Sequence, residues 1–338
     1  MTAIQFVQTA ASPQGIAPSA EGQALELIEI CGRTAYKSEE KITRDSARSF
    51  VLMLKKHGHL SVLEHSNAVL RIAGSAPGVE GHHPPLEAFQ ESLKACLGSR
   101  IGYHRMAHLS AAVGFAVSGN FRAWIDTLEY FREREPRYAV FFQTHLNRFY
   151  PSLFHAPERP SEDFSNVTVS LLEEDEQLSA LRRDPTSDLP VFVFKFVCDR
   201  GITHEVVRHR VLSFTQESTR YVNYGNKGMT VILPEELEPF FDPLSGGFSA
   251  QSPLVEMWTQ RLETIFRWYQ NDLDRGLKPQ TARDILPNLL KSEILVSGRW
   301  SGWKHFIALR DSAQAHPRIR FIAREVRKYF ETLGLSAG

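Results

Sequence analysis

The chain has 338 residues, enough for one large domain or two smaller ones with a sizeable core. Its 39 basic and 39 acidic side chains cancel; a general nucleic-acid binder usually has a basic excess, so that class is disfavoured and any anion site must be local. Cys31, Cys96 and Cys198 are widely spaced and form no C-x-x-C pair, which argues against a disulfide framework or a zinc ribbon.

Neither a membrane span nor a signal peptide is indicated. No apolar run approaches the roughly 18 residues that a bilayer span requires. The first residues, MTAIQFVQTAASPQG, lack a basic segment followed by an apolar run. We therefore expect a cytoplasmic globular protein with no membrane partner.

Helical spacing of apolar residues predicts helices over residues 19–33 and 43–59, and residues 60–72 are expected to form a loop that leads into a strand. Helical periodicity returns in LEAFQESLKACLG and FRAWIDTLEYFRERE. Residues 154–189 are acidic, rich in proline and weakly periodic, so long loops are expected there. The segment 73–189 is therefore predicted to be mostly helix and loop.

The second half begins with the clearest strand of the chain, PVFVFKFVC at residues 190–198, whose apolar run indicates burial on both faces. A turn at Gly201 and an N-cap at Thr203 predict a short helix that ends near the basic run 208–210. LSFTQESTRYVNYG is polar and predicts a loop. A long amphipathic helix at 255–276, a helix from near Thr281, a strand at EILVSG and two final helices follow. The pattern predicts a mixed α/β (α+β) fold with a central sheet and long helices.

The segment 208–221, RHRVLSFTQESTRY, carries three arginines and a histidine around two serines. Guanidinium forks, hydroxyls and loop N–H groups suit a phosphate. The alternative is a solvated basic helix end, which does not require serines interleaved with arginines. No G-x-S-x-G turn, G-x-G-x-x-G fingerprint or G-x-x-x-x-G-K-[ST] loop occurs.

The segment 57–65, HGHLSVLEH, raises the question of a metal site. His59 and His65 are six residues apart and lack the i, i+4 spacing of a helical zinc pair. A histidine that is buried and hydrogen-bonded, or stacked on a ligand, is the preferred interpretation, and no metal is predicted.

RHRVLSFTQESTRY resembles the signature of the flavin-dependent thymidylate synthases, the ThyX family, which reads RHR-x-x-S, four residues, S-x-R. HGHLSVLEH, CDRGITHEVVRHR, ARDILP and WKHFIALR resemble further segments of that family, in its order. The resemblance covers about residues 20–72 and 190–330. It implies a family core at residues 1–72 and 190–338 and an insertion at residues 73–189.

The resemblance implies reductive methylation of dUMP at C5 to give dTMP. Methylenetetrahydrofolate would supply the carbon, and FAD reduced by NADPH would supply the hydride. Family members are homotetramers with active sites at subunit interfaces. Thymidylate synthases of the other family use a cysteine nucleophile, and none of the three cysteines here lies in a segment that matches theirs, in keeping with the ThyX route without a cysteine nucleophile. Two alternatives stay open: methylation of another pyrimidine nucleotide such as UMP, and a non-catalytic nucleotide-binding paralogue.

By position in the family's segments, Arg310 is expected to stabilise the ionised uracil as the catalytic residue. The dUMP site is expected to comprise Glu205, Val206, Val207, Arg208, Gln216, Glu217, Ser218, Thr219, Arg220, Arg283 and Arg310, with Ser218 and Arg220 on the phosphate. The FAD site is expected to comprise Ser61, His65, Arg208, His209, Arg210, Gln216, Arg299, Trp300, Ser301 and His305.

One departure from the family pattern concerns the flavin site. Family members usually carry N-x-R before the tryptophan of the late segment, where this chain has Arg299, Trp300 and Ser301. The expected pattern stands instead in the insertion, as VSGNFRAW at residues 117–124, which echoes VSGRWSGW at residues 296–303. Either the insertion is a peripheral layer, or it folds toward the flavin and Arg122 replaces the cation missing at Ser301. The echo also suggests a partial duplication.

Overall fold

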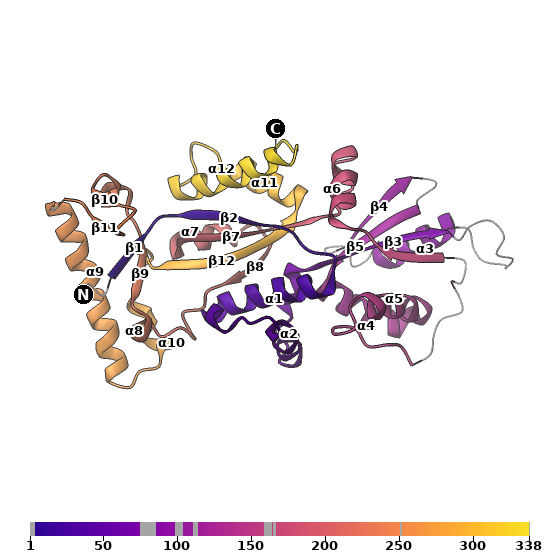
Figure 1. The fold of residues 1–338 in the computed structure, drawn as a ribbon, viewed down its shortest axis with the longest axis horizontal. Coiled ribbons are helices and arrows are strands. Elements are labelled where there is room, and N and C mark those ends of the chain that lie inside the picture. The colour runs from indigo at the N-terminus through magenta and orange to yellow at the C-terminus, as the bar shows by residue number, and fades with distance from the viewer. Residues whose placement is uncertain are drawn as a thin grey trace.

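The computed structural model describes residues 4–74, 86–98, 104–110, 114–158, 164, 167–250 and 252–337. Two four-stranded antiparallel sheets follow each other along the long axis of the molecule, with helices packed on their faces (Figure 1). The expected mixed α/β fold is confirmed. No helix within these described ranges is both long and apolar enough to cross a membrane.

The central sheet has the order β2-β7-β12-β8. It consists of β2 (Ala10–Ile16), β7 (Val191–Asp199), β12 (Lys291–Arg299) and β8 (Ser213–Gln216). Phe192, Phe194 and Phe196 of β7 pack with α11 (Trp300–Arg310) and α12 (Pro317–Thr332), while the valine face packs with α1 (Glu21–Tyr36). The strand predicted at residues 190–198 is therefore confirmed, and it is buried on both faces.

The second sheet has the order β4-β5-β3-β6. Its strands are β4 (His104–Ser110), β5 (Gly114–Asn120), β3 (Asn67–Gly74) and β6 (Val167–Leu171), and its main helices are α3 (Leu86–Gly98), α4 (Phe121–Arg134) and α5 (Pro136–Phe149). Three of these strands lie between residues 73 and 189, where helices and loops were expected. The boundary expected at residue 73 falls inside β3, which pairs with both β5 and β6.

The long loops expected at 154–189 are only partly present, because β6 and α6 (Glu174–Arg183) lie there. A capping box formed by Glu173 and Glu176 starts α6, with acidic residues in its first turn and arginines in its last. These are favourable positions relative to the helix dipole. Leu178 and Leu181, spaced by three residues, are buried. Because most residues of α6 are charged or polar, its narrow apolar face did not produce a recognisable helical pattern in the sequence.

Two expectations near the signature segment were wrong. The N-cap of α7 (Arg200–Val206) is Asp199, whose side chain accepts from Ile202 N at 2.9 Å, and not Thr203. Of the segment expected to be a loop, SFTQ is a strand, because Ser213–Gln216 forms β8, which pairs with β12. A four-residue edge strand has too little periodicity to be seen locally, and its ladder partners lie about 80 residues away in the sequence.

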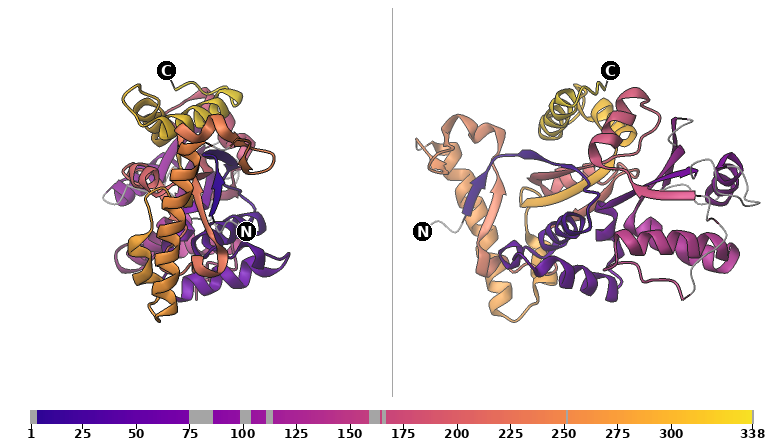
Figure 2. Two further views of the ribbon diagram at one scale, coloured as in Figure 1. Left: turned by 90° about the vertical axis from the view of Figure 1, so that its left-hand side faces the viewer. Right: turned by 45° about the vertical axis from the view of Figure 1, so that its right-hand side comes forward.

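The remaining elements complete the molecule and place a third group at the end opposite α3–α5 (Figures 1 and 2). Two of them, η1 (Glu39–Lys41) and α2 (Ser46–Lys56), contact α1, and η2 (Leu60–His65) contacts both β8 of the central sheet and β5 of the second sheet. The third group comprises β1 (Ile4–Val7), α8 (Tyr224–Lys227), β9 (Met229–Ile232), η3 (Glu235–Phe240), β10 (Phe241–Asp242), β11 (Gly247–Phe248), α9 (Pro253–Asp274), α10 (Pro279–Ala282) and η4 (Arg283–Ile285). The helices predicted at 19–33, 43–59 and 255–276 correspond to α1, α2 and α9.

Candidate functional site

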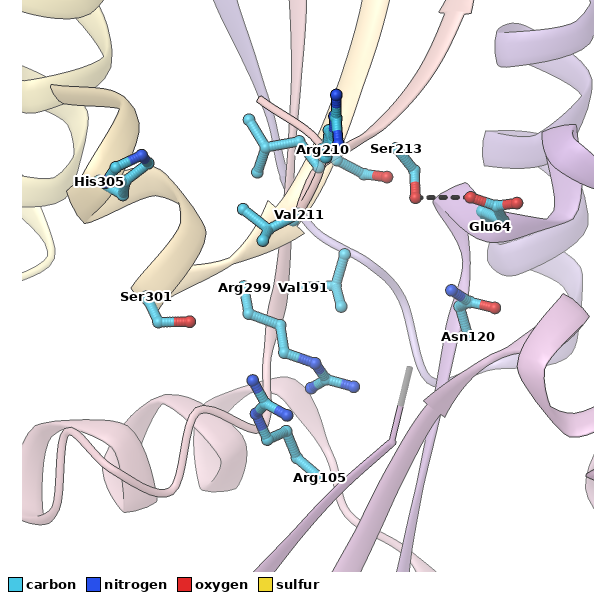
Figure 3. A pocket seen from close by; sticks show the side chains of 13 residues that line it. Glu64, Arg105, Asn120, Val191, Arg210, Val211, Ser213, Arg299, Ser301 and His305 are labelled. Carbon is cyan, nitrogen blue, oxygen red and sulfur yellow. Dashed lines mark hydrogen bonds between the residues drawn. The ribbon is translucent and has the colours of Figure 1, made fainter. Parts of the chain in front are cut away.

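A cavity of about 600 Å³ lies where the two sheets meet (Figure 3). This volume is in the range of small-molecule and cofactor sites. The second sheet region contributes residues from η2, β4 and β5, and the central sheet region contributes the turn after α7, β12 and α11. The lining residues are Glu64, Arg105, Asn120, Val191, Arg210, Val211, Leu212, Ser213, Ser297, Gly298, Arg299, Ser301 and His305.

One wall is held by Glu64 of η2. Its Oε2 accepts a hydrogen bond from Ser213 Oγ at 2.8 Å, as Figure 3 shows, and its Oε1 forms an ion pair with Arg122 at 2.6 Å. Arg122 therefore neutralises Glu64 from outside this cavity. The alternative in which the insertion folds toward the flavin and Arg122 replaces the cation missing at Ser301 gains no support from this ion pair.

The opposite wall is organised by Asp188. This buried residue adopts φ +45°, which aspartate tolerates better than most residues, and it precedes β7. Its carboxylate accepts from Ser301 N at 3.1 Å and Ser301 Oγ at 2.5 Å. Arg299 donates to Ser118 Oγ and to the carbonyls of Asp188 and Leu189 at 2.8–2.9 Å. Burial lowers the pKa of Arg299 to about 10, so it remains charged and ties the two sheets together.

A fully buried histidine lies behind the cavity. The Nε2 atom of His65 is 2.8 Å from Thr215 Oγ1 of β8, and its Nδ1 has no hydrogen-bond partner within the described part of the chain. Burial lowers the pKa of His65 to about 3, so the ring is neutral. His57 and His59 are exposed, and no group of three or more potential metal ligands occurs among the described residues. The interpretation of His65 as a buried, hydrogen-bonded histidine agrees with this placement.

A second cluster adjoins the cavity at the end of α11. Arg310 Nε donates to His209 Nε2 at 2.9 Å, and its two terminal nitrogens donate to the side chain and the carbonyl of Glu205 at 2.8 and 2.9 Å. Burial, with contributions from Arg310 and His305, lowers the pKa of His209 to about 4. His209 is therefore neutral and serves as the acceptor that fixes Arg310. The rings of His209 and His305 are 5.9 Å apart, which connects this cluster to the cavity.

The signature loop leads away from this cluster along β8. Gln216 donates to Thr203 Oγ1 at 2.9 Å and to Ser292 Oγ at 3.0 Å. Ser218 N donates to Ala35 O at 2.9 Å, and its Oγ accepts from Arg220 N at 3.3 Å. These contacts fix the loop backbone between α1 and the central sheet.

Further along, the loop meets η4. Arg283 NH1 donates to Thr219 Oγ1 at 3.1 Å, so the two predicted nucleotide-binding segments come together. Glu217 is buried and already bound, by Tyr224 Oη at 2.9 Å and by an ion pair with Lys291 at 3.2 Å. Its predicted contact with a nucleotide remains a prediction.

The structure thus brings together most of the residues that the sequence singled out. Arg210, Arg299, Ser301 and His305 line the cavity. His209 and Glu205 surround Arg310. Val206 and Trp300 are buried in the core instead, and Trp300 packs on Phe330 with ring centroids 4.7 Å apart. The remaining predicted site residues are Ser61 in η2 and Val207 and Arg208 after α7.

Sequence analysis missed three charged residues of the site: Glu64, Arg105 and Asp188. Glu64 stands within HGHLSVLEH, so the segment was found but not its carboxylate. Arg105 and Asp188 lie in the insertion, outside every segment that carried the resemblance. The echo VSGNFRAW was the only local signal that pointed to this region, and its Asn120 does line the cavity.

The family model of the thymidylate synthase complementing proteins matches residues 178–333. The chain is 34% identical over 128 residues to a flavin-dependent thymidylate synthase of Pyrococcus abyssi, covering 37% of this chain and 48% of that protein. It is 38% identical over 133 residues to one of Mycobacterium marinum, covering 37% and 51%. The chain therefore spans about half the length of these curated relatives.

Solved structures also match. A UMP/dUMP methylase PolB from Streptomyces cacaoi, bound with 5-Br UMP, is 22% identical with a TM-score of 0.37, covering 46% of this chain and 75% of that chain. The same protein bound with 5-Br dUMP matches at 24% identity with a TM-score of 0.36.

Proposed function

Residues 178–333 match the family model of the thymidylate synthase complementing proteins and resemble flavin-dependent thymidylate synthases, and on this basis we propose that this chain methylates dUMP at C5 to form dTMP. The observation that carries the proposal is the convergence of the family segments on one site. His305 lines the cavity, its ring lies beside that of His209, and His209 binds Arg310. The Arg310 cluster and a cofactor-sized cavity are thereby adjacent.

The nucleotide is proposed to bind along the signature loop. Ser218 and Arg220 would hold its phosphate, because a hydroxyl and a guanidinium fork suit a phosphate oxygen. Arg283 reaches the same loop through Thr219 at 3.1 Å. The other proposed contacts are Gln216, Glu217 and the Glu205–Arg208 segment at the end of α7.

Arg310 is proposed to activate the uracil. C5 of uracil is a weak nucleophile, and a fixed positive charge beside the ring oxygens stabilises the electron-rich, ionised form. Glu205 and His209 already hold the guanidinium at three hydrogen bonds, so little reorganisation is needed when the nucleotide binds. Because His209 is neutral, it orients Arg310 without adding a competing positive charge.

The cavity is proposed to hold FAD, through Arg210, Ser213, Arg299, Ser301 and His305. These residues fit the cofactor, since Arg210 and Arg105 bring cations and Ser213, Ser301 and Asn120 bring polar groups to a cavity of suitable size. When bound and reduced by NADPH, FAD supplies the hydride of the reaction, and methylenetetrahydrofolate supplies the carbon. Assembly as a homotetramer and a cytoplasmic location are likewise proposed.

The decisive experiment is tritium release from C5-labelled dUMP and from C5-labelled UMP, each with methylenetetrahydrofolate, FAD and NADPH. We expect release from dUMP that requires all three additions. Preferential release from UMP would establish the related nucleotide methylase instead. Absence of release from both, in a protein that still binds dUMP, would establish a non-catalytic paralogue.

A further inference from the structure

Two strand-to-helix junctions in the chain have the same construction. β5 leads into α4 after VSGN, and β12 leads into α11 after VSGR. The N-cap residues Asn120 and Arg299 have nearly the same backbone angles, φ −69°, ψ 162° and φ −80°, ψ 164°. The echo in the sequence therefore marks a structural equivalence.

The two tryptophans confirm this equivalence. Gly119 is paired with Ala68 of β3, and the indole N–H of Trp124 donates to Ala68 O at 3.3 Å. Gly298 is paired with Phe192 of β7, and the indole N–H of Trp303 donates to Phe192 O at 3.2 Å. In each junction the indole N–H of the tryptophan thus donates a hydrogen bond to the backbone carbonyl of the residue that is paired with the glycine.

The equivalence extends to both sheets. The orders β2-β7-β12-β8 and β6-β3-β5-β4 have the same form, and every neighbouring pair is antiparallel. The last three strands also follow the same order along the chain, as β7, β8, β12 and as β3, β4, β5. The strands β3, β4 and β5 are followed by α4 and α5, and the strands β7, β8 and β12 are followed by α11 and α12. The second helix of each pair begins at a proline, Pro136 in α5 and Pro317 in α12.

The edge strands are exchanged between the two sets. β2 precedes β3 in the chain but pairs with β7, whereas β6 precedes β7 but pairs with β3. Residues 10–149 and 167–332 can therefore be described as two copies of one unit, each of which gives its first strand to the other. This is the arrangement of a strand-swapped dimer, here within a single chain.

Equivalent residues of the two units meet in the cavity. Arg105 is paired with Ser118 in the first unit, and Ser213 is paired with Ser297 in the second. Arg105 and Ser213 line the same cavity, as do the equivalent N-cap residues Asn120 and Arg299 (Figure 3). When two copies of a unit face each other symmetrically, equivalent patches meet at one interface, so the cavity belongs to the contact between the copies.

We propose that this cavity is a single anion site shared by both units, in which Arg105 of the first unit binds a phosphate of the ligand and Asn120 lines the same wall. The identification of the ligand as the pyrophosphate-bearing FAD rests on the proposed function. The first unit, residues 10–149, is thereby a second, diverged copy that completes the cofactor site within one chain, and the insertion supplies its β4, β5, α4 and α5.

The charges of the cavity support an anionic ligand. The carboxylate of Glu64 is paired with Arg122, and that of Asp188 is engaged by Ser301. Arg105 is 38% exposed and lies 3.6 Å from Asp188, a loose contact that leaves its guanidinium fork able to bind another group. Arg210 lines the cavity from the second unit, so each unit brings an arginine to it.

The test compares FAD affinity in the full-length chain, measured by the change in flavin fluorescence on binding. We expect Arg105→Gln to weaken FAD binding at least tenfold and Arg105→Lys to weaken it less. Asn120→Asp preserves the helix cap, because aspartate is an equally good N-cap residue, and should weaken FAD binding by adding a negative charge. Arg132→Gln is the matched control, since Arg132 lies on the exposed side of α4 away from the cavity.

A second arm uses inorganic pyrophosphate in calorimetric titrations, which does not depend on the flavin. Pyrophosphate binding that Arg105→Gln and Arg210→Gln both weaken supports the shared site, even if the chain binds no FAD and the proposed function fails. Unchanged binding of both probes in Arg105→Gln, with a loss in Arg210→Gln, would overturn the inference and leave the proposed function standing. If the unaltered chain binds neither probe, both proposals fail.

Discussion

At the scale of single residues, Arg310 carries the clearest prediction. Arg310→Ala should lose most turnover of dUMP while FAD binding is retained, because its guanidinium contacts Glu205 and His209 and does not line the flavin cavity. Arg310→Lys should restore little activity, since a point charge cannot make the three directed hydrogen bonds. The measurement is tritium release beside a FAD titration. Near-normal turnover in Arg310→Ala would remove this residue from the reaction.

Ser218 tests the nature of the nucleotide site. Its Oγ accepts from Arg220 N, and no histidine contacts it within the described residues, so it is expected to bind phosphate and not to act as a nucleophile. Ser218→Ala should raise KM for dUMP and leave a measurable kcat. Complete loss of turnover at saturating dUMP, in a protein with unchanged circular dichroism, would favour a nucleophilic role.

His209 makes stability depend on pH. Its pKa is about 4 in the folded protein, below the value of about 6.5 for an exposed histidine. The unfolded chain therefore binds more protons between these values, and the contribution of His209 is fully present above pH 6.5 and declines as the pH falls toward 4. His209→Gln should reduce the loss of unfolding free energy between pH 7 and pH 5, measured by urea denaturation. The exposed His57→Gln serves as control, and equal pH dependence in both variants would contradict the assignment.

At the scale of elements, the β12–α11 junction depends on a glycine. A Cβ atom at Gly298 would overlap Leu212 Cδ2 and would lie 3.7 Å from Trp303 Nε1. Gly298→Ala should therefore lower the free energy of unfolding by about 1–3 kcal/mol, the usual cost of overpacking a core. Because Leu212 and Gly298 both line the cavity, FAD affinity should fall as well.

Gly22 offers the matched control. It lies in α1 and a Cβ there has no neighbour within 4 Å, so Gly22→Ala should be neutral or stabilise the protein by about 0.5–1 kcal/mol through the helix propensity of alanine. Both variants are compared by urea denaturation. A Gly298→Ala protein as stable as Gly22→Ala would show that Leu212 moves aside at no cost.

At the scale of the whole molecule, the two sheets are expected to unfold together. One hydrophobic cluster joins Val193 and Leu295 of the central sheet with Phe121 and Trp124 of the second sheet region. The exchanged strands add backbone hydrogen bonds between the two units, because β2 pairs with β7 and β6 pairs with β3. Scanning calorimetry should give one transition whose calorimetric and van't Hoff enthalpies agree. Two resolved transitions would instead show that the two sheets unfold independently.

The sequence by itself determined the elements whose burial pattern is local. The alternating apolar residues of 190–198 and the long amphipathic run at 255–276 predicted β7 and α9, because side-chain periodicity follows from strand and helix geometry alone. The arginine- and serine-rich signature likewise predicted an anion site, because its residue types are suited to phosphate wherever they are placed.

Only the tertiary structure decided the edge strands and the composition of the cavity. β6 has five residues and β8 has four, and their hydrogen-bond partners lie far away in the chain. No local sequence pattern therefore predicts these two strands. Arg105 and Asp188 join the site because strand pairing and the turn before β7 bring them beside Arg299. Their chemistry depends on neighbours that the linear sequence does not place next to them.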